Sequence, residues 1–188
     1  MANKTTVALT IEQYQDIIST MRSGGSGFRP NDRIATCLVL EANLGMRIED
    51  ILKLRFCDII RDGSRYRLDI VEQKTKKKRN FTVPLQIYQY IQLYCIEHNI
   101  DSKDVIFPIT ERAVQKHLQK VVDYLEYGNS IGTHSFRKFF ATEIYKNNGY
   151  DIVLVQKLLQ HSSVAITQKY VGIEASIENA LYNHIKLM

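Results

Sequence analysis

The most informative segment of the chain is Thr133-His134-Ser135-Phe136-Arg137. If a helix begins near Thr133, His134 and Arg137 lie three residues apart and share one face. The neighbouring face carries four apolar side chains that can anchor the helix in a core, namely Phe136, Phe139, Phe140 and Ile144. The sequence therefore predicts a helix over 135–147 that holds a His–Arg pair rigidly at a surface.

The helical period of apolar residues recurs on both sides of this segment. Thr10 can cap a first helix, whose apolar face holds Ile11, Tyr14, Ile17, Ile18 and Met21, and the glycine-rich run 23–27 ends it. Pro30 can open the next helix, and Gly45 can stop it. Further helices or helical stripes are predicted over 30–44, 48–54, 87–94, 114–125, 152–159 and 173–185. The helix over 30–44 is apolar nearly all round, so we expect it to be central.

Between residues 57 and 84 the pattern changes to that of strands. Cys57–Arg61 and Tyr66–Glu72 flank the turn Asp62-Gly63-Ser64, which predicts a hairpin. A basic turn then leads to a third strand over 81–84. The predicted fold class is mainly α with a small three-stranded antiparallel sheet, in one domain over residues 1–188.

Composition limits the functional classes. The formal net charge is +5 and the pI is about 9.0, which favours a polyanionic partner. No apolar run reaches the length of a membrane span, and the N-terminus lacks a secretory signal, so the expected location is the cytoplasm, without a membrane partner. Cys37, Cys57 and Cys95 are widely spaced in apolar stretches, and we expect three reduced, buried thiols.

Four other positions join His134 and Arg137 as candidates for chemistry. They are Arg47 where two helices join, Lys74 at a turn between strands, His161, and Tyr170. Guanidiniums can bind phosphate oxygens, a phenol can act as a nucleophile, and a lysine or histidine can protonate a leaving oxygen. The set therefore suits phosphoryl transfer. No glycine-rich nucleotide loop and no acidic cluster for two metals occurs, so neither a cofactor nor a metal is expected.

Each of these residues also has an ordinary structural interpretation. The basic run 74–79 can be a solvated turn that protects a sheet edge. His134 can be a helix-capping residue, and Arg137 can belong to a surface ion pair. Tyr170 is one of eleven tyrosines and can serve packing alone. A zinc site from His134 and His161 is not expected, because no HExxH motif or cysteine pair accompanies them.

In order and spacing, the six candidates resemble the tyrosine recombinase (phage integrase) family, from about Thr10 to the end of the chain. The resemblance implies that Tyr170 attacks a DNA phosphate and forms a 3′-phosphotyrosine. It implies that Arg47 and Arg137 clamp the phosphate and that Lys74 is the general acid. It also implies that His134 assists proton transfer, that His161 binds a phosphate oxygen, and that Asp50 supports the site.

The sequence departs from the usual family pattern at several positions. Phe136 replaces the usual leucine between His134 and Arg137, and Gln160 replaces the usual glycine before His161. Lys76 is a second candidate for the general acid. The basic residues expected to contact DNA are Lys76, Lys77, Lys78 and Arg79. Only nine residues precede the first predicted helix, so we expect the N-terminal core-binding domain of most family members to be absent, in an excised domain or a short family member.

The resemblance favours a site-specific recombinase or integrase of a phage or mobile element, which acts on double-stranded DNA. Self-association into a synaptic tetramer through the predicted helix 173–185 is implied as well. Two alternatives stay open: a type IB topoisomerase-like enzyme that relaxes DNA, and a non-catalytic DNA-binding regulator on the same fold. The biological role, whether integration, excision, inversion or dimer resolution, is open.

Overall fold

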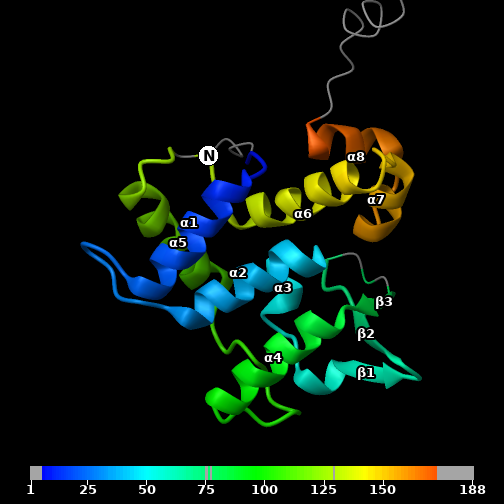
Figure 1. Cartoon of the computed structure of the whole chain (residues 1–188), viewed down its shortest axis with the longest axis horizontal. Helices are drawn as coiled ribbons and strands as arrows, with labels where there is room; N and C mark the ends of the chain where they lie inside the picture. The colour runs from blue at the N-terminus through cyan, green and yellow to red at the C-terminus, as the bar shows by residue number, and fades with distance from the viewer. Residues whose placement is uncertain (1–5, 75, 77, 129, 173–188) are drawn as a thin grey trace, which may run out of the picture. The chain divides into compact units, whose positions relative to one another are not determined.

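The computed structural model describes residues 6–74, 76, 78–128 and 130–172. It is mostly helical with one three-stranded antiparallel sheet, which confirms the predicted fold class (Figure 1). The elements in chain order are α1 Ile11–Ser23, α2 Asp32–Leu44, α3 Ile48–Ile51, the 3-10 helix η1 Phe56–Asp58, β1 Ile59–Asp62, β2 Arg65–Val71, β3 Lys78–Val83, α4 Leu85–Glu97, α5 Glu111–Tyr124, α6 Thr133–Asn147, α7 Ile152–Leu159 and α8 Val164–Val171. The chain divides into two compact units, Met1–Phe140 and Ala141–Met188.

The predicted ends of the first two helices are closely matched. Thr10 and Gln13 form a reciprocal capping box at the start of α1. Asn31 rather than Pro30 precedes α2, because its side chain accepts a hydrogen bond from the Ile34 N–H at 3.0 Å. Gly45 ends α2 with φ +57°, and a Cβ at this position would approach the Phe140 ring to 2.3 Å. Both the backbone angle and the close approach require glycine there.

The sheet has the order β1-β2-β3, and a two-residue turn at Gly63-Ser64 joins the first hairpin. Two boundaries differ from the prediction. β1 begins at Ile59, because residues 56–58 form η1, where the Asp58 carboxylate accepts the Arg55 N–H at 2.8 Å. β3 begins at Lys78, because Lys78 pairs with Val71 across the ladder. Part of the basic run therefore belongs to a strand.

The core of the first unit centres on α2, as predicted. This helix buries residues on all sides, namely Ile34, Ala35, Thr36, Cys37, Leu38, Leu40, Glu41, Ala42 and Leu44. Cys37 and Cys95 are buried, but Cys57 is exposed, so the expectation of three buried thiols is wrong for Cys57. The reason is that Cys57 lies in the short helix η1 and not in a strand.

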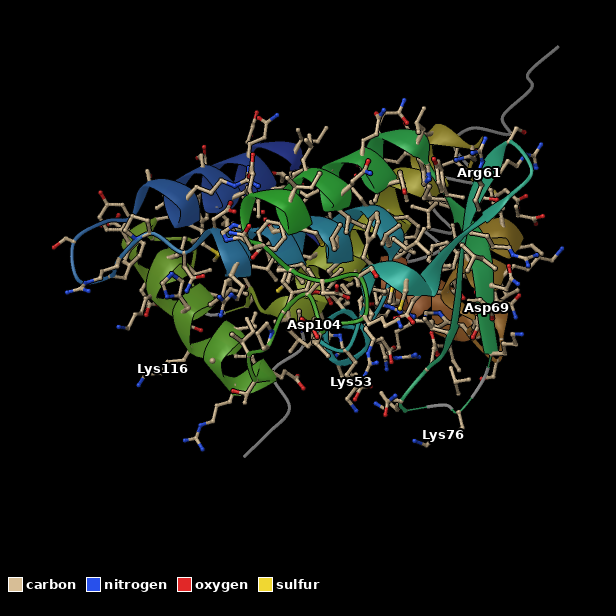
Figure 2. All side chains as sticks on the ribbon, turned by 90° about the horizontal axis from the view of Figure 1, so that it is seen from below. Lys53, Arg61, Asp69, Lys76, Asp104 and Lys116 are labelled. Carbon is tan, nitrogen blue, oxygen red and sulfur yellow. The ribbon has the colours of Figure 1, made fainter. Side chains whose placement is uncertain are left out.

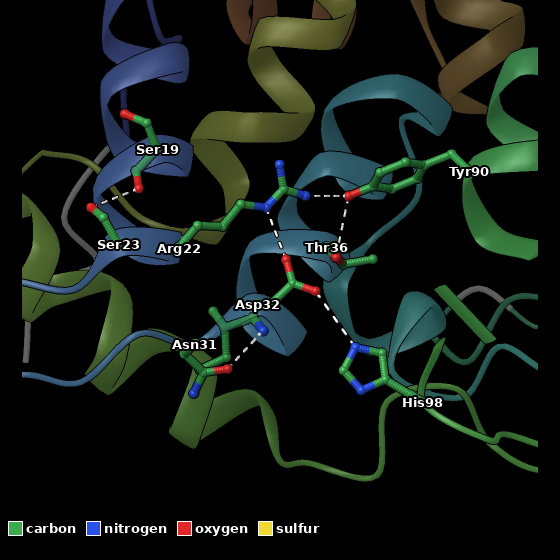
Figure 3. A network of polar contacts seen from close by, with 9 residues as sticks. Ser19, Arg22, Ser23, Asn31, Asp32, Thr36, Tyr90 and His98 are labelled. Carbon is green, nitrogen blue, oxygen red and sulfur yellow. Dashed lines mark hydrogen bonds and ion pairs between the residues drawn. The ribbon is translucent and has the colours of Figure 1, made fainter. Parts of the chain in front are cut away.

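A polar network ties α1, α2 and α4 together at the surface (Figure 3). Arg22 donates from Nε to Asp32 Oδ1 at 2.9 Å and from Nη2 to the Tyr90 hydroxyl at 2.5 Å. The Tyr90 hydroxyl also lies 3.2 Å from Thr36 Oγ1, and His98 Nε2 lies 3.6 Å from Asp32 Oδ2. The network therefore joins the three helices and runs from exposed side chains inward to the buried Thr36. Within the described residues, no helix combines the length and apolar character that crossing a membrane requires.

Candidate active site

The first unit contains a pocket of about 380 Å³ that several of the predicted residues line. Its lining residues are Arg47, Ile48, Glu49, Lys74, Glu111 and His134. They come from the junction between α2 and α3, the connection between β2 and β3, and the first turns of α5 and α6. Segments far apart in the sequence therefore place three predicted site residues around one space.

Arg47 reaches this pocket from the residue just before α3, where its backbone is extended. Its Nη1 atom donates to Glu72 Oε2 at 2.5 Å. The Arg47 side chain is 15% exposed and the Glu72 side chain is 0% exposed. A fully buried carboxylate thus holds one side of a guanidinium that borders an open pocket.

Lys74 and Asp50 are linked through the residue that precedes Lys74. The Gln73 N–H donates to Asp50 Oδ1 at 2.8 Å. Burial raises the pKa of the Asp50 carboxyl, while this hydrogen bond acts in the opposite direction and Glu72 and Glu49 raise the pKa further. Asp50 is buried and Lys74 is exposed, so Asp50 supports the backbone that presents Lys74 to solvent.

Arg137 lies against the C-terminal end of α2. Its Nη1 atom donates to the Gly45 carbonyl oxygen at 2.7 Å, and the residue is 2% exposed. The carbonyl end of a helix favours a cation, so α2 helps to hold this charge. Phe136 is fully buried as predicted, and Phe139 and Phe140 are half-buried, so α6 is anchored beside the arginine.

His134 is exposed on α6 among these cations. Partial desolvation by the surrounding protein lowers the pKa of His134, and repulsion from Arg137, Lys74 and Arg47 lowers it further, with Glu49 opposing. The three cations are therefore close enough to act on one imidazole. The structure brings together Arg47, Lys74, His134 and Arg137 in the first unit.

His161 and Tyr170 lie together in the second unit. Their ring centroids are 5.1 Å apart with the planes at 78°, an edge-to-face contact. His161 Nδ1 is 3.1 Å from the hydroxyl of the buried Thr167, which itself donates to the Ser163 carbonyl at 3.3 Å. A hydroxyl on α8 therefore fixes the orientation of the imidazole that follows α7.

The departure at Gln160 has a visible consequence in the same unit. Gln160 ends α7 with φ +56°, a left-handed conformation that suits glycine. The turn is nevertheless formed: the His161 N–H donates to the Gln156 carbonyl at 3.1 Å, and Gln156 Nε2 donates to the His161 carbonyl at 3.2 Å. The backbone of His161 is therefore held from both sides by one residue.

The predicted basic contacts are placed only in part. Lys76 and Lys78 are exposed, and Lys76 extends outward from the β2–β3 connection (Figure 2). Lys78 pairs with Asp69 at 3.1 Å. Lys77 and the predicted helix 173–185 lie outside the described residues, as does the side chain of Arg79.

Sequence reasoning missed two buried carboxylates beside the arginines. Glu72 is one, and its signal was period-two alternation: it follows Leu68 and Ile70 on the inward face of β2. Glu41 is the other, and its signal was a single charge on a helix that is otherwise apolar all round. Burial raises the pKa of Glu41 well above its usual range, with attraction to Arg137 opposing and repulsion from Glu111 adding.

Comparisons with known proteins identify the class to which this fold and these residues belong. The model of the phage integrase family matches residues 8–176, and the chain belongs to this family. The chain is 29% identical over 160 residues to the probable integrase/recombinase YoeC of Bacillus subtilis, covering 81% of this chain and 84% of that protein. It is 29% identical over 169 residues to tyrosine recombinase XerA of Thermococcus onnurineus, covering 87% of this chain and 57% of XerA.

Solved structures show the same fold. The catalytic domain of bacteriophage HP1 integrase matches with a TM-score of 0.66 at 15% identity, over 95% of each chain. The XerH recombinase bound to its difH substrate matches with a TM-score of 0.69 at 20% identity, over 95% of this chain and 53% of that one. The chain thus spans nearly all of some relatives and little more than half of others.

Among the described residues, no group of three or more His, Cys, Asp and Glu side chains is arranged to hold a metal ion.

Proposed function

We propose that this protein is a site-specific DNA recombinase or integrase that cleaves and rejoins strands through a phosphotyrosine at Tyr170. The observation that carries the proposal is the pocket of the first unit, where Arg47, Lys74 and His134 line one space together with Glu49 and Glu111. Arg137 contributes a fourth group whose charge is felt at His134. A phosphodiester is the kind of anion that such a pocket suits. DNA is the expected partner because related recombinases, such as XerH and the Tn1549 integrase, have been solved with DNA.

The reaction needs one nucleophile and one acid. The Tyr170 hydroxyl gives its proton to the neutral His134 as its oxygen attacks phosphorus, the bond to the 5′ oxygen breaks, and Lys74 gives that oxygen a proton. The products are a 3′-phosphotyrosine and a free 5′ hydroxyl. In the second step the 5′ hydroxyl of a partner strand gives its proton to Lys74 and attacks the same phosphorus, and the tyrosine leaves with a proton from His134. The phosphotyrosine retains the energy of the broken bond, so no nucleotide is needed, and the two arginines supply the positive charge that a metal ion would otherwise bring.

The remaining residues stabilise charge or move protons in this proposal. Arg47 and Arg137 bind the non-bridging oxygens, where negative charge grows in the transition state. The lowered pKa of His134 favours the neutral ring, which can take part in proton transfer at neutral pH. His161, oriented by Thr167, donates to a phosphate oxygen. The basic residues of the β2–β3 connection contact the DNA backbone, and the segment 173–185 joins protomers in a synaptic tetramer.

The experiment that tests the proposal is capture of the covalent intermediate. The probe is a pool of randomised, nicked duplexes labelled at the 5′ end of the cleaved strand, so that cleavage releases a short fragment and traps the adduct. A labelled protein band that survives denaturation and forms in the presence of EDTA is the expected result. Tyr170→Phe should abolish the band, while Tyr150→Phe, at an exposed tyrosine of the same unit, should retain it. An adduct of undiminished yield in Tyr170→Phe would refute the assignment.

A further inference from the structure

A buried carboxylate contacts Arg47, the arginine that lines the pocket. Glu72 is 0% exposed, and its Oε2 atom accepts from Arg47 Nη1. It lies just beyond β2, on the face that Leu68 buries in the core. Burying a carboxylate is unfavourable unless the charge is paired, so the local structure depends on Arg47 remaining where it is.

The next residue along the chain carries a second tie to the same helical junction. The Gln73 N–H donates to Asp50 Oδ1 at 2.8 Å, and Asp50 lies three residues after Arg47 in α3. The Glu72 carbonyl also accepts the Lys76 N–H at 3.0 Å, which closes the turn around Lys74. Residues 72 and 73 are thus fastened to α3 and its N-terminal flank, immediately before Lys74.

These ties matter because the sheet does not hold Lys74. The ladder between β2 and β3 ends at the pair Val71–Lys78, and the connection between them carries Lys74 beyond the last paired residues. A lysine at the pocket margin needs a fixed backbone to place its ammonium group on one oxygen atom. Among the described residues, the contacts of Glu72 and Gln73 with Arg47 and Asp50 hold the backbone that precedes Lys74.

We propose that Glu72 is a positioning residue of the active site: its carboxylate orients Arg47 and, through the adjoining backbone, holds Lys74 at the pocket. This inference rests on the proposed function. The buried Glu72 side chain would then link the position of Arg47, which binds the phosphate, to the position of Lys74, which is the general acid. Loss of the carboxylate should therefore impair both charge stabilisation and leaving-group protonation, while the fold and DNA binding persist.

Glu72→Gln is the principal variant, because it removes the charge and keeps the shape. Glu72→Asp keeps the charge and shortens its reach, so it should be less impaired. The matched control is Asp62→Asn, which removes a carboxylate from an exposed pair with Arg67 on the same sheet. We expect the rate of adduct formation to fall on the order of 10²-fold in Glu72→Gln, as for other small misplacements of reacting groups. The control should stay within about twofold of the unmodified protein, as expected for an exposed pair.

Two altered DNA probes separate positioning from a general structural defect. A substrate with sulfur in place of the 5′ bridging oxygen releases a thiolate, which needs no proton, so it bypasses Lys74. A methylphosphonate at the scissile position lacks the negative charge that Arg47 stabilises. The defect of Glu72→Gln, measured against the unmodified protein on the same probe, should shrink at least tenfold on each. Lys74→Met shows how much activity the sulfur-substituted probe restores when the general acid is lost. Arg47→Met shows how much the methylphosphonate probe restores when the arginine is lost.

A Glu72→Gln defect of equal size on all three probes would overturn the proposal, because a merely destabilised protein gains nothing from either substitution. A rate within twofold of the unmodified protein would overturn it as well. If the unmodified protein forms no adduct, the proposed function fails, and hydrogen exchange still tests the positioning. The backbone amide hydrogens of Gln73 and Lys76 should then exchange faster in Glu72→Gln, and their exchange rates should not change in Asp62→Asn. Unaltered exchange rates in Glu72→Gln would refute the positioning role.

Discussion

The first unit contains two arginine–carboxylate pairs that have the same chemistry and differ in their exposure to solvent. Arg22 and Asp32 meet at 2.9 Å with side chains 41% and 43% exposed. Arg47 and Glu72 meet at 2.5 Å with side chains 15% and 0% exposed. Water solvates the first pair whether or not it forms, whereas the second has replaced that water with protein. The buried pair is therefore retained at a free-energy cost, next to the pocket where a fixed guanidinium is useful.

The largest expected effect comes from breaking the buried pair on one side. Arg47→Met removes the guanidinium that faces the buried Glu72 charge and should lower the free energy of unfolding by about 3–5 kcal/mol at neutral pH. Urea denaturation followed by circular dichroism measures the loss. The double variant Arg47→Met/Glu72→Met should recover most of it, because no charge is then buried. A double variant as unstable as the single one would show that the pair itself, and not the stranded charge, provides the stability.

Glu41 sharpens the comparison, because it is a buried carboxyl whose two oxygens have no hydrogen-bond partner among the described residues. Its folded-state pKa is raised, so from about pH 4.5 upward the unfolded chain loses the proton first and the folded state becomes less stable until its own pKa is reached. Glu41→Gln escapes this loss and should gain on the order of 1–2 kcal/mol at pH 8. Thermal unfolding across pH 4 to 8 checks it. A gain that does not shrink toward pH 4 would contradict the protonation argument.

The smallest effect is expected for the exposed pair. A double-mutant cycle of Arg22→Ala and Asp32→Ala should give a coupling free energy of at most about 1 kcal/mol, because both side chains are half in water. Urea denaturation at low salt and in 1 M NaCl measures the coupling and its screening. His98 Nε2 also lies 3.6 Å from Asp32 Oδ2, so the cycle is repeated in a His98→Ala background. A coupling above about 3 kcal/mol would mean that exposure does not separate the two pairs.

Sequence reasoning predicted the local parts of the fold and the identity of the candidate site residues. The helix cap at Thr10, the stop at Gly45 and the hairpin turn at Gly63 follow from interactions within four residues, and the structure has all three. The roles of the six candidate residues stay predictions, although four of them gather in the first unit and two in the second. Sequence reasoning failed where a segment departed from its simplest local pattern, as at Cys57 and at the start of β3.

The amino-acid sequence is therefore enough to infer the helical and strand periods, the caps and turns, and the family. Periodicity, caps and turns depend on spacings of two to four residues, which can be read directly from the sequence. Which charges are buried, in contrast, depends on how distant segments pack in the folded chain. Glu72 meets Arg47 across 25 residues and Arg137 meets the Gly45 carbonyl across 92, and no local rule links partners so far apart. Burial changes the free energy of a charge more than its neighbours in sequence do, so the environment of the candidate site appears only when the chain has folded.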